Sequence, residues 1–117
     1  VLISTPEYNA SLPGGLKNAL DWASRPFPDN VLRDKPCAVI GASTGLFGAV
    51  WAQAELRKVL ASTGARVIDL ELPVAKAHEA FDARGALISD DHDTRVAEVL
   101  AALAGEVAAD RQLAAAA

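Results

Sequence analysis

Apolar runs alternate with turn-forming residues along the chain. Three of these runs predict strands, at residues 1–5, 36–42 and 65–72. The first two are almost entirely apolar, which is typical of strands buried on both faces of a sheet. The third alternates apolar and polar residues in part, as an edge or half-covered strand does. The pattern therefore predicts two central strands and one less protected strand.

Helical spacing of apolar residues predicts three helices between and after these strands. The first follows Pro13 and runs to about Ser24. The second runs from about Leu46 to Thr63, where Gly64 supplies the usual helix end. Residues 93–109 form the third helix, with one apolar stripe made of Val96, Leu100, Leu103 and Val107.

The remaining C-terminal residues are less regular. Residues 73–92 carry no clear period, and Phe81 and Leu87 are the expected anchors of this segment to the core. The alanine-rich residues 114–117 are expected to fray. On ideal helical geometry Trp51 lies about half a turn around its helix from Leu60. Only one of these two faces can pack on the sheet, which makes Trp51 a candidate for a subunit interface.

Strands that alternate with helices predict a parallel sheet with right-handed crossovers. Ligands bind such sheets at the carboxyl ends of the strands. Two loops follow strands there, at residues 6–13 and 41–46. The first contains Glu, Tyr and Asn, and the second is rich in Gly and Ser. These loops are where the chemistry is expected.

Composition narrows the class of protein. The 117 residues are 51% hydrophobic and carry a formal net charge of −4, which fits one domain with a core. Without a block of Lys or Arg, neither a nucleic-acid surface nor a membrane surface is expected. Cys37 is the single cysteine and is expected to be a buried, inert thiol. No signal peptide is visible, so the expected location is the cytoplasm. No metal site is expected, because His78 and His92 lack metal-ligand spacing.

Two dense motifs carry a family resemblance. The first runs through Thr5-Pro6-Glu7-Tyr8-Asn9, Ser11, Pro13-Gly14 and Leu16-Lys17-Asn18-Ala19-Leu20-Asp21-Trp22. The second runs through Gly41-Ala42-Ser43-Thr44-Gly45, Phe47-Gly48, Ala52-Gln53 and Leu56-Arg57, with Ala80-Phe81-Asp82, Gly85 and Leu87 further on. Together they resemble the NAD(P)H-dependent FMN reductase and quinone/chromate reductase family.

The resemblance implies a flavodoxin-like fold, a parallel three-layer α/β/α sandwich, in dimers or tetramers. It implies FMN as cofactor, NAD(P)H as co-substrate and a small electron acceptor such as a quinone, with no side-chain acid or base assigned. The isoalloxazine ring is expected against Pro6, Glu7, Tyr8, Asn9, Ser43, Thr44 and Gly45.

Elementary chemistry agrees with that placement. A flavin is a flat apolar ring with one polar edge, so it needs a flat surface and backbone N–H groups. Tyr8 offers an aromatic ring, Asn9 an amide, and Gly41 and Gly45 allow close backbone approach. A helix opening near Leu46 is expected to favour negative charge on reduced flavin.

The family's loop for the FMN phosphate follows its first strand and is rich in Gly, Ser and Arg. Nothing in the chain matches it. Residues 1–117 are therefore expected to be the C-terminal portion of a single domain, with the first two βα units absent. On its own this portion is expected to bind FMN poorly, since phosphate contacts supply much of the affinity.

Three alternatives stay open. Gly41-Ala42-Ser43-Thr44-Gly45 also fits the nucleophile elbow of serine hydrolases, with Asp69 and His92 following in hydrolase order. A flavodoxin-type electron carrier would keep the flavin but not the reductase activity. A degenerate, non-catalytic subunit would keep only the fold.

Overall fold

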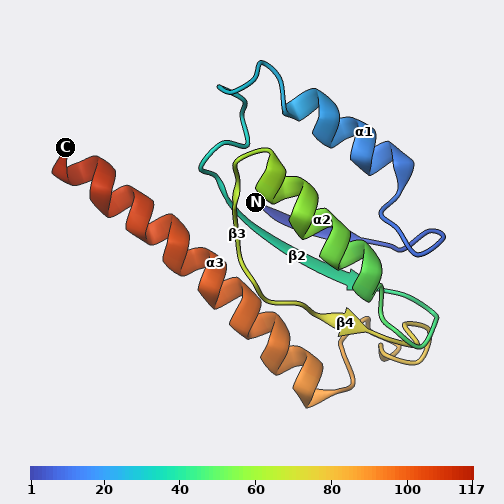
Figure 1. Cartoon of the computed structure of the whole chain (residues 1–117). Coiled ribbons are helices and arrows are strands. Elements are labelled where there is room, and N and C mark those ends of the chain that lie inside the picture. The colour runs from blue at the N-terminus through green and yellow to red at the C-terminus, as the bar shows by residue number, and fades with distance from the viewer.

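The computed structural model describes residues 1–117 as one parallel sheet between helices (Figure 1). The strands are β1 (Leu2–Thr5), β2 (Pro36–Ala42), β3 (Arg66–Val67) and β4 (Pro73–Val74). The helices are α1 (Gly14–Ala23), α2 (Val50–Ser62) and α3 (Asp90–Ala116). In the sheet β2 is central, with β1 on one side and both β3 and β4 on the other, all parallel to it.

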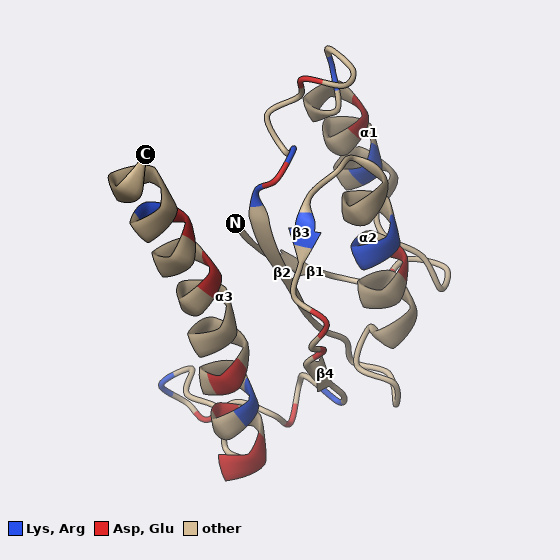
Figure 2. Ribbon diagram, turned by 60° about the vertical axis from the view of Figure 1, so that its left-hand side comes forward, with Lys and Arg blue, Asp and Glu red and all other residues tan.

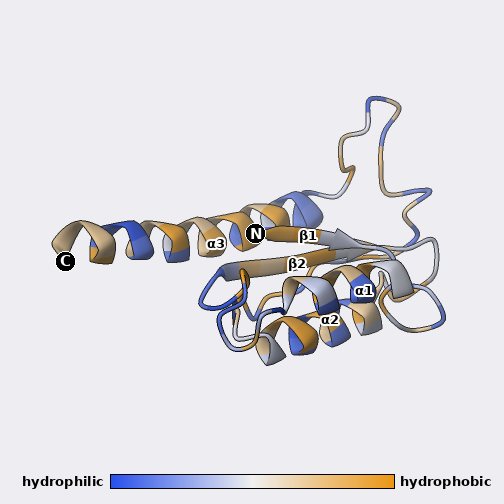
Figure 3. Ribbon diagram, turned by 90° about the horizontal axis from the view of Figure 1, so that it is seen from above, coloured by the Kyte–Doolittle hydropathy of each residue, from blue (hydrophilic) through white to orange (hydrophobic).

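The elements form three layers. Seen from above, α1 and α2 lie on one face of the sheet and α3 on the other (Figure 3). The two long strands carry no charged residue, and the charges lie mainly on helices and connections (Figure 2). The prediction of a parallel three-layer α/β/α sandwich is confirmed. None of the helices α1, α2 and α3 has the length and apolar composition that a membrane span requires.

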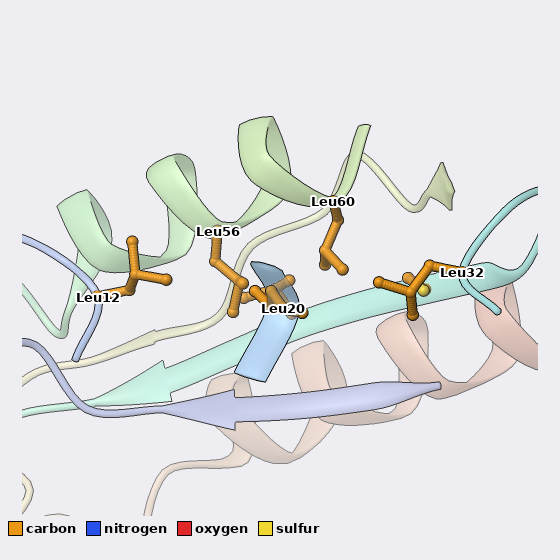
Figure 4. Close-up of a cluster of buried hydrophobic side chains, with 7 residues drawn as sticks. Leu12, Leu20, Leu32, Leu56 and Leu60 are labelled. Carbon is orange, nitrogen blue, oxygen red and sulfur yellow. The ribbon is translucent and has the colours of Figure 1, made fainter. Parts of the chain in front are cut away.

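The core lies between the sheet and the helices α1 and α2. It is made by leucines from both helices and the loops that flank them, packed on Cys37 and Val39 of β2 (Figure 4). Leu56 and Leu60 are 0% exposed, and each contributes roughly 1.5–3 kcal/mol by leaving water. Trp51, on the opposite face of α2, is 48% exposed, as its helical phase predicts. Cys37 is 0% exposed, which confirms its predicted burial, and that burial raises the pKa of its thiol.

The prediction that the second helix starts near Leu46 is wrong, because α2 starts at Val50. Gly48 and Ala49 both have φ of 60°, and left-handed residues cannot extend a right-handed helix. The predicted end is confirmed. Gly64 has φ of 89°, and the Gly64 and Ala65 N–H groups bond to the carbonyls of Ala61 and Leu60, which is a Schellman motif.

The prediction of one continuous strand at 65–72 is also wrong. Cys37 pairs with Val67, but Gly41 pairs with Pro73, so residues 68–72 bulge opposite only residues 38–40. The cause is the fully buried amide of Gln53. It accepts from the Leu72 N–H and donates to the Leu72 carbonyl, each at 3.0 Å, as a neighbouring strand would.

The last helix is longer than predicted at both ends, and residues 114–116 are helical rather than frayed. Three aspartates in its first turn, Asp90, Asp91 and Asp93, explain the early start, since negative charge stabilises a helix N-terminus. Val99, at 1% exposure, is its central contact with the sheet, whereas Leu100 of the predicted stripe is 45% exposed.

Candidate functional site

The two predicted loops leave the same edge of the sheet. β1 and β2 are parallel and in register from Leu2 with Ala38 to Thr5 with Gly41. Pro6 therefore follows its strand beside Ala42. The backbones are close here: a Cβ on Gly41 would lie 2.9 Å from the Thr5 carbonyl oxygen. The rim, defined here as residues 6–9 and 43–45, is built by these two strand ends.

The first loop is a tight turn that presents its polar residues to solvent. Tyr8 and Ser11 exchange backbone hydrogen bonds of 2.9 and 3.1 Å. Between them Asn9 and Ala10 have φ of 52° and 59°, the pattern of a type I′ turn. Tyr8 is 61% exposed, so its ring does not cap the core and is free to contact a ligand.

Glu7 joins the first loop to the helix that follows the second loop. Its Oε2 accepts hydrogen bonds from the Trp51 and Ala52 N–H groups at 3.0 Å each, which caps the start of α2. These two N–H groups are therefore not available to the negative charge of a reduced flavin. A carboxylate of the chain itself occupies them.

A second carboxylate fixes the other end of the first loop. Ser11 Oγ donates to Glu55 Oε2, and the Leu12 N–H donates to the same oxygen at 3.3 Å. The Ser11 hydroxyl, and then the Leu12 N–H, lower the pKa of Glu55, because both stabilise its charged form. Sequence reasoning missed this contact, since no local signal links residues so far apart.

The second loop is held by β4 and the segment that follows it. The Ser43 N–H donates to the Val74 carbonyl at 3.0 Å, and the Ser43 carbonyl accepts from the Ala77 N–H at 2.9 Å. The Lys76 N–H donates to the Gly45 carbonyl at 2.9 Å. These bonds hold Ser43 and the Gly45 carbonyl in place. They leave Thr44 and Gly45 exposed at the tip of the loop.

Four backbone N–H groups on the rim have no hydrogen-bond partner within the chain. They belong to Glu7 and Asn9 in the first loop and to Thr44 and Gly45 in the second. Two loops at one sheet edge thus present unused donors, which is what the polar edge of a planar heterocycle requires. None of the cavities in the chain is lined by the seven predicted site residues, so the rim is an open ledge.

An exposed apolar patch adjoins the second loop. It consists of Leu46, Phe47 and Trp51, which are 69%, 58% and 48% exposed. The Phe47 and Trp51 rings pack in a tilted arrangement with centroids 4.9 Å apart. Side chains of this size exposed together mark a contact surface.

The geometry does not favour a serine hydrolase. A nucleophile elbow places its serine on the sharp turn between a strand and the helix that follows directly. Here a run of turns separates Ser43 from Val50, where α2 begins. The Ser43 hydroxyl has no hydrogen bond to a histidine, and His92 Nδ1 is buried without a partner.

A three-layer α/β protein with an open rim of free N–H donors belongs to the class of parallel-sheet proteins that bind ligands at the carboxyl ends of their strands. Comparison with known proteins identifies one family within this class. The family of NADPH-dependent FMN reductases matches residues 1–79, and the chain belongs to that family.

Individual relatives agree with the family. The chain is 43% identical over 104 residues to an NAD(P)H-dependent FMN reductase of Pseudomonas aeruginosa, covering 88% of the chain and 56% of that protein. It is 46% identical over 92 residues to a 2-hydroxy-1,4-benzoquinone reductase of a Burkholderia species, covering 78% and 50%.

A solved structure gives the same result for the fold. FerB, a flavoenzyme NAD(P)H:(acceptor) oxidoreductase from Paracoccus denitrificans, superposes with a TM-score of 0.72 at 40% identity. The match covers 88% of this chain and 57% of FerB. The chain thus spans about half the length of the proteins it matches.

Proposed function

We propose that the protein is an FMN-dependent oxidoreductase that takes hydride from NAD(P)H and passes the electrons to a quinone or a similar small acceptor. Family membership supports this, as do the reductases among the relatives. These similarities favour a reductase over an electron carrier, a non-catalytic subunit or a hydrolase. The flavin, when bound, supplies the hydride and electron transfer, and the protein binds and orients it.

The observation that carries the proposal is the set of unpaired N–H groups on the rim. In this proposal Thr44 and Gly45 donate to the polar edge of the isoalloxazine ring, beside Ser43. The ring lies against Pro6 and Tyr8, and Asn9 adds an amide from the first loop. Glu7 acts mainly as a positioning residue, since its carboxylate fixes the first loop to α2.

The phosphate of FMN is proposed to bind outside these residues. Neither residues 6–13 nor residues 43–48 contain a Lys or Arg that could neutralise a phosphate dianion. We propose that residues 1–117 are the C-terminal part of one flavodoxin-like domain, and that they bind FMN weakly when isolated. The length of the relatives supports this arrangement.

The proposed partner is a second copy of the protein, in a homodimer or homotetramer. The exposed patch of Leu46, Phe47 and Trp51 supports it, because apolar area of this kind is normally covered. Such a contact beside the rim would also shield a bound flavin from water. The proposed location is the cytoplasm, as the sequence predicts.

The test is to express the gene-encoded protein, purify it with excess FMN, and measure bound flavin and NAD(P)H-dependent quinone reduction. We expect yellow protein and turnover. Asn9→Ala should lower flavin retention or turnover, while Asn18→Ala, on the exposed face of α1, should change neither. Colourless protein would contradict the proposal, and bound flavin without NAD(P)H consumption would favour an electron carrier.

A further inference from the structure

Two glutamates join the first loop to α2 in opposite directions. Glu7, in the loop, accepts from two N–H groups at the start of the helix. Glu55, one turn further along the same helix, accepts from the Ser11 hydroxyl and the Leu12 N–H at the end of the loop. No other hydrogen bond joins residues 7–12 to another segment of the chain. The polar attachment of the loop therefore depends on two carboxylates.

The turn between these two attachments is strained at Ala10. Tyr8 and Ser11 exchange backbone hydrogen bonds, and the residues between them, Asn9 and Ala10, have φ of 52° and 59°. Such a turn requires positive φ at both central positions and therefore favours Asn followed by Gly. Asn tolerates this region, whereas the Cβ of Ala10 is pushed toward the following carbonyl oxygen. Both residues are exposed, so packing does not offset the strain.

Glu55 supplies bonds that offset this strain. Its Oε2 binds Ser11, the last residue of the turn, and the Leu12 N–H directly after it. The Ser11 hydroxyl and then the Leu12 N–H lower the pKa of Glu55, with smaller contributions from Lys58 on α2 and Lys17 on α1. The carboxylate is therefore charged at neutral pH, which strengthens both hydrogen bonds. The buried Leu12 fixes the chain beyond the turn, so Glu55 adds the orientation of Ser11.

From this geometry we infer that Glu55 is a positioning residue of the rim, which holds the turn in the conformation that places Tyr8 and Asn9 against a flavin ring. The inference rests on the proposed function, because that function names the ligand of the rim. Glu55 acts through the turn and is assigned no contact with the flavin. It lies between Gln53 and Leu56 of the second motif but belongs to neither motif, so the family resemblance does not assign it a role.

The first measurement uses the flavin-free, gene-encoded protein and needs no ligand. Amide hydrogen exchange at Tyr8 and Ser11 reports the two bonds that close the turn. Glu55→Ala should speed exchange at both amides about tenfold, because the turn loses charge-assisted support, while Leu60 of α2 should exchange as before. Glu98→Ala removes a carboxylate that bonds within α3, on the other face of the sheet, and is the matched control.

The second measurement is the Kd of the same variants for FMN, followed by quenching of flavin fluorescence. Glu55→Ala should raise the Kd about tenfold, since apparent affinity falls with the fraction of protein in which the turn is formed. Glu55→Gln should raise it only about threefold, because the amide oxygen still accepts but carries no charge. Adding Ala10→Gly to Glu55→Ala should restore most of the affinity, because glycine adopts positive φ without strain. A general loss of stability would not be repaired by a glycine in an exposed turn.

Three results would overturn the inference: unchanged exchange at Tyr8 and Ser11 in Glu55→Ala, faster exchange with an unchanged Kd for FMN, or a raised Kd that Ala10→Gly does not lower. If Glu55→Ala does not fold, Glu55→Gln with and without Ala10→Gly gives the same comparison. Failure of the proposed function has a different signature. The unsubstituted protein would then bind no FMN, and the inference would fail with it.

Discussion

At the scale of single residues, the turn between the second loop and α2 depends on Gly48. Its φ is 60°, and a Cβ there would lie 2.5 Å from the Pro73 carbonyl carbon. Gly48→Ala is therefore expected to lower the free energy of unfolding by about 3 kcal/mol, because both the backbone conformation and the contact resist a side chain. Urea denaturation measures the loss.

Gly85 provides the matched control for that substitution. Its φ is 82°, but a Cβ there would meet nothing within 4 Å. Gly85→Ala should cost only the conformational part, about 1 kcal/mol. Equal losses at the two positions would show that the approach of Gly48 to β4 is not tight.

A second residue-scale prediction concerns Glu55, whose pKa is lowered first by the Ser11 hydroxyl and then by the Leu12 N–H. A depressed folded-state pKa stabilises the fold above the ordinary pKa of a glutamate, and that stability is lost as pH falls through the folded value. Ser11→Ala should raise the Glu55 pKa and flatten the loss of stability in acid. Carboxyl NMR titration measures the shift.

Ser62→Ala is the control for Ser11→Ala, because Ser62 donates to the Lys58 carbonyl on the same helix and not to Glu55. It should leave the Glu55 titration unchanged. If Ser11→Ala also leaves the titration unchanged, the hydroxyl does not hold the carboxylate in solution.

At the scale of elements, Gln53 connects α2, the turn at Gly48 and the segment leading into β4. Its side chain is 0% exposed and makes three hydrogen bonds of 3.0 Å, two to Leu72 and one to the Gly48 carbonyl. Gln53→Ala should lower the free energy of unfolding by about 3 kcal/mol, because buried backbone groups lose their partners. Amide hydrogen exchange at Leu72 should become faster.

Gln112→Ala, on the exposed end of α3, removes the same side chain where it has no such partners. It should change stability by no more than about 0.5 kcal/mol. Slow exchange at Leu72 in Gln53→Ala would mean that the backbone finds another partner and that the side chain does not create the bulge.

The elements that could be predicted from the sequence are those decided by neighbouring residues. The apolar run of β2, the start of α1 after Pro13 and the end of α2 at Gly64 are local patterns, and the structure confirms them. The split of the third strand could not be predicted. It depends on Gln53 pairing with Leu72, a contact between residues distant in the sequence.

At the scale of the whole molecule, the parallel order of strands was enough to predict that the two loops share one edge of the sheet. The details of the rim were not predictable in the same way. Glu7 reads as a polar ligand contact in the sequence, but its carboxylate caps α2. Only the folded structure shows which polar groups make hydrogen bonds within the chain and which have no partner there.

The exposed patch beside the rim predicts self-association of the gene-encoded protein. Trp51→Ala should raise the Kd of the proposed dimer about tenfold or more, since buried tryptophans dominate interface energies. Analytical ultracentrifugation measures it. Trp22→Ala removes an equally large side chain from α1, where it is 77% exposed and outside the patch, and serves as control. Equal effects of both variants would argue against this patch as the interface.

The most direct test of the central claim is to map FMN onto the isotope-labelled chain by amide chemical shifts at high flavin concentration. Weak binding suffices for this measurement. The account predicts that the largest shifts fall on Glu7, Asn9, Thr44 and Gly45, whose N–H groups have no partner in the chain. Shifts concentrated at the opposite end of the sheet, or a rim that does not respond to saturating flavin, would contradict it.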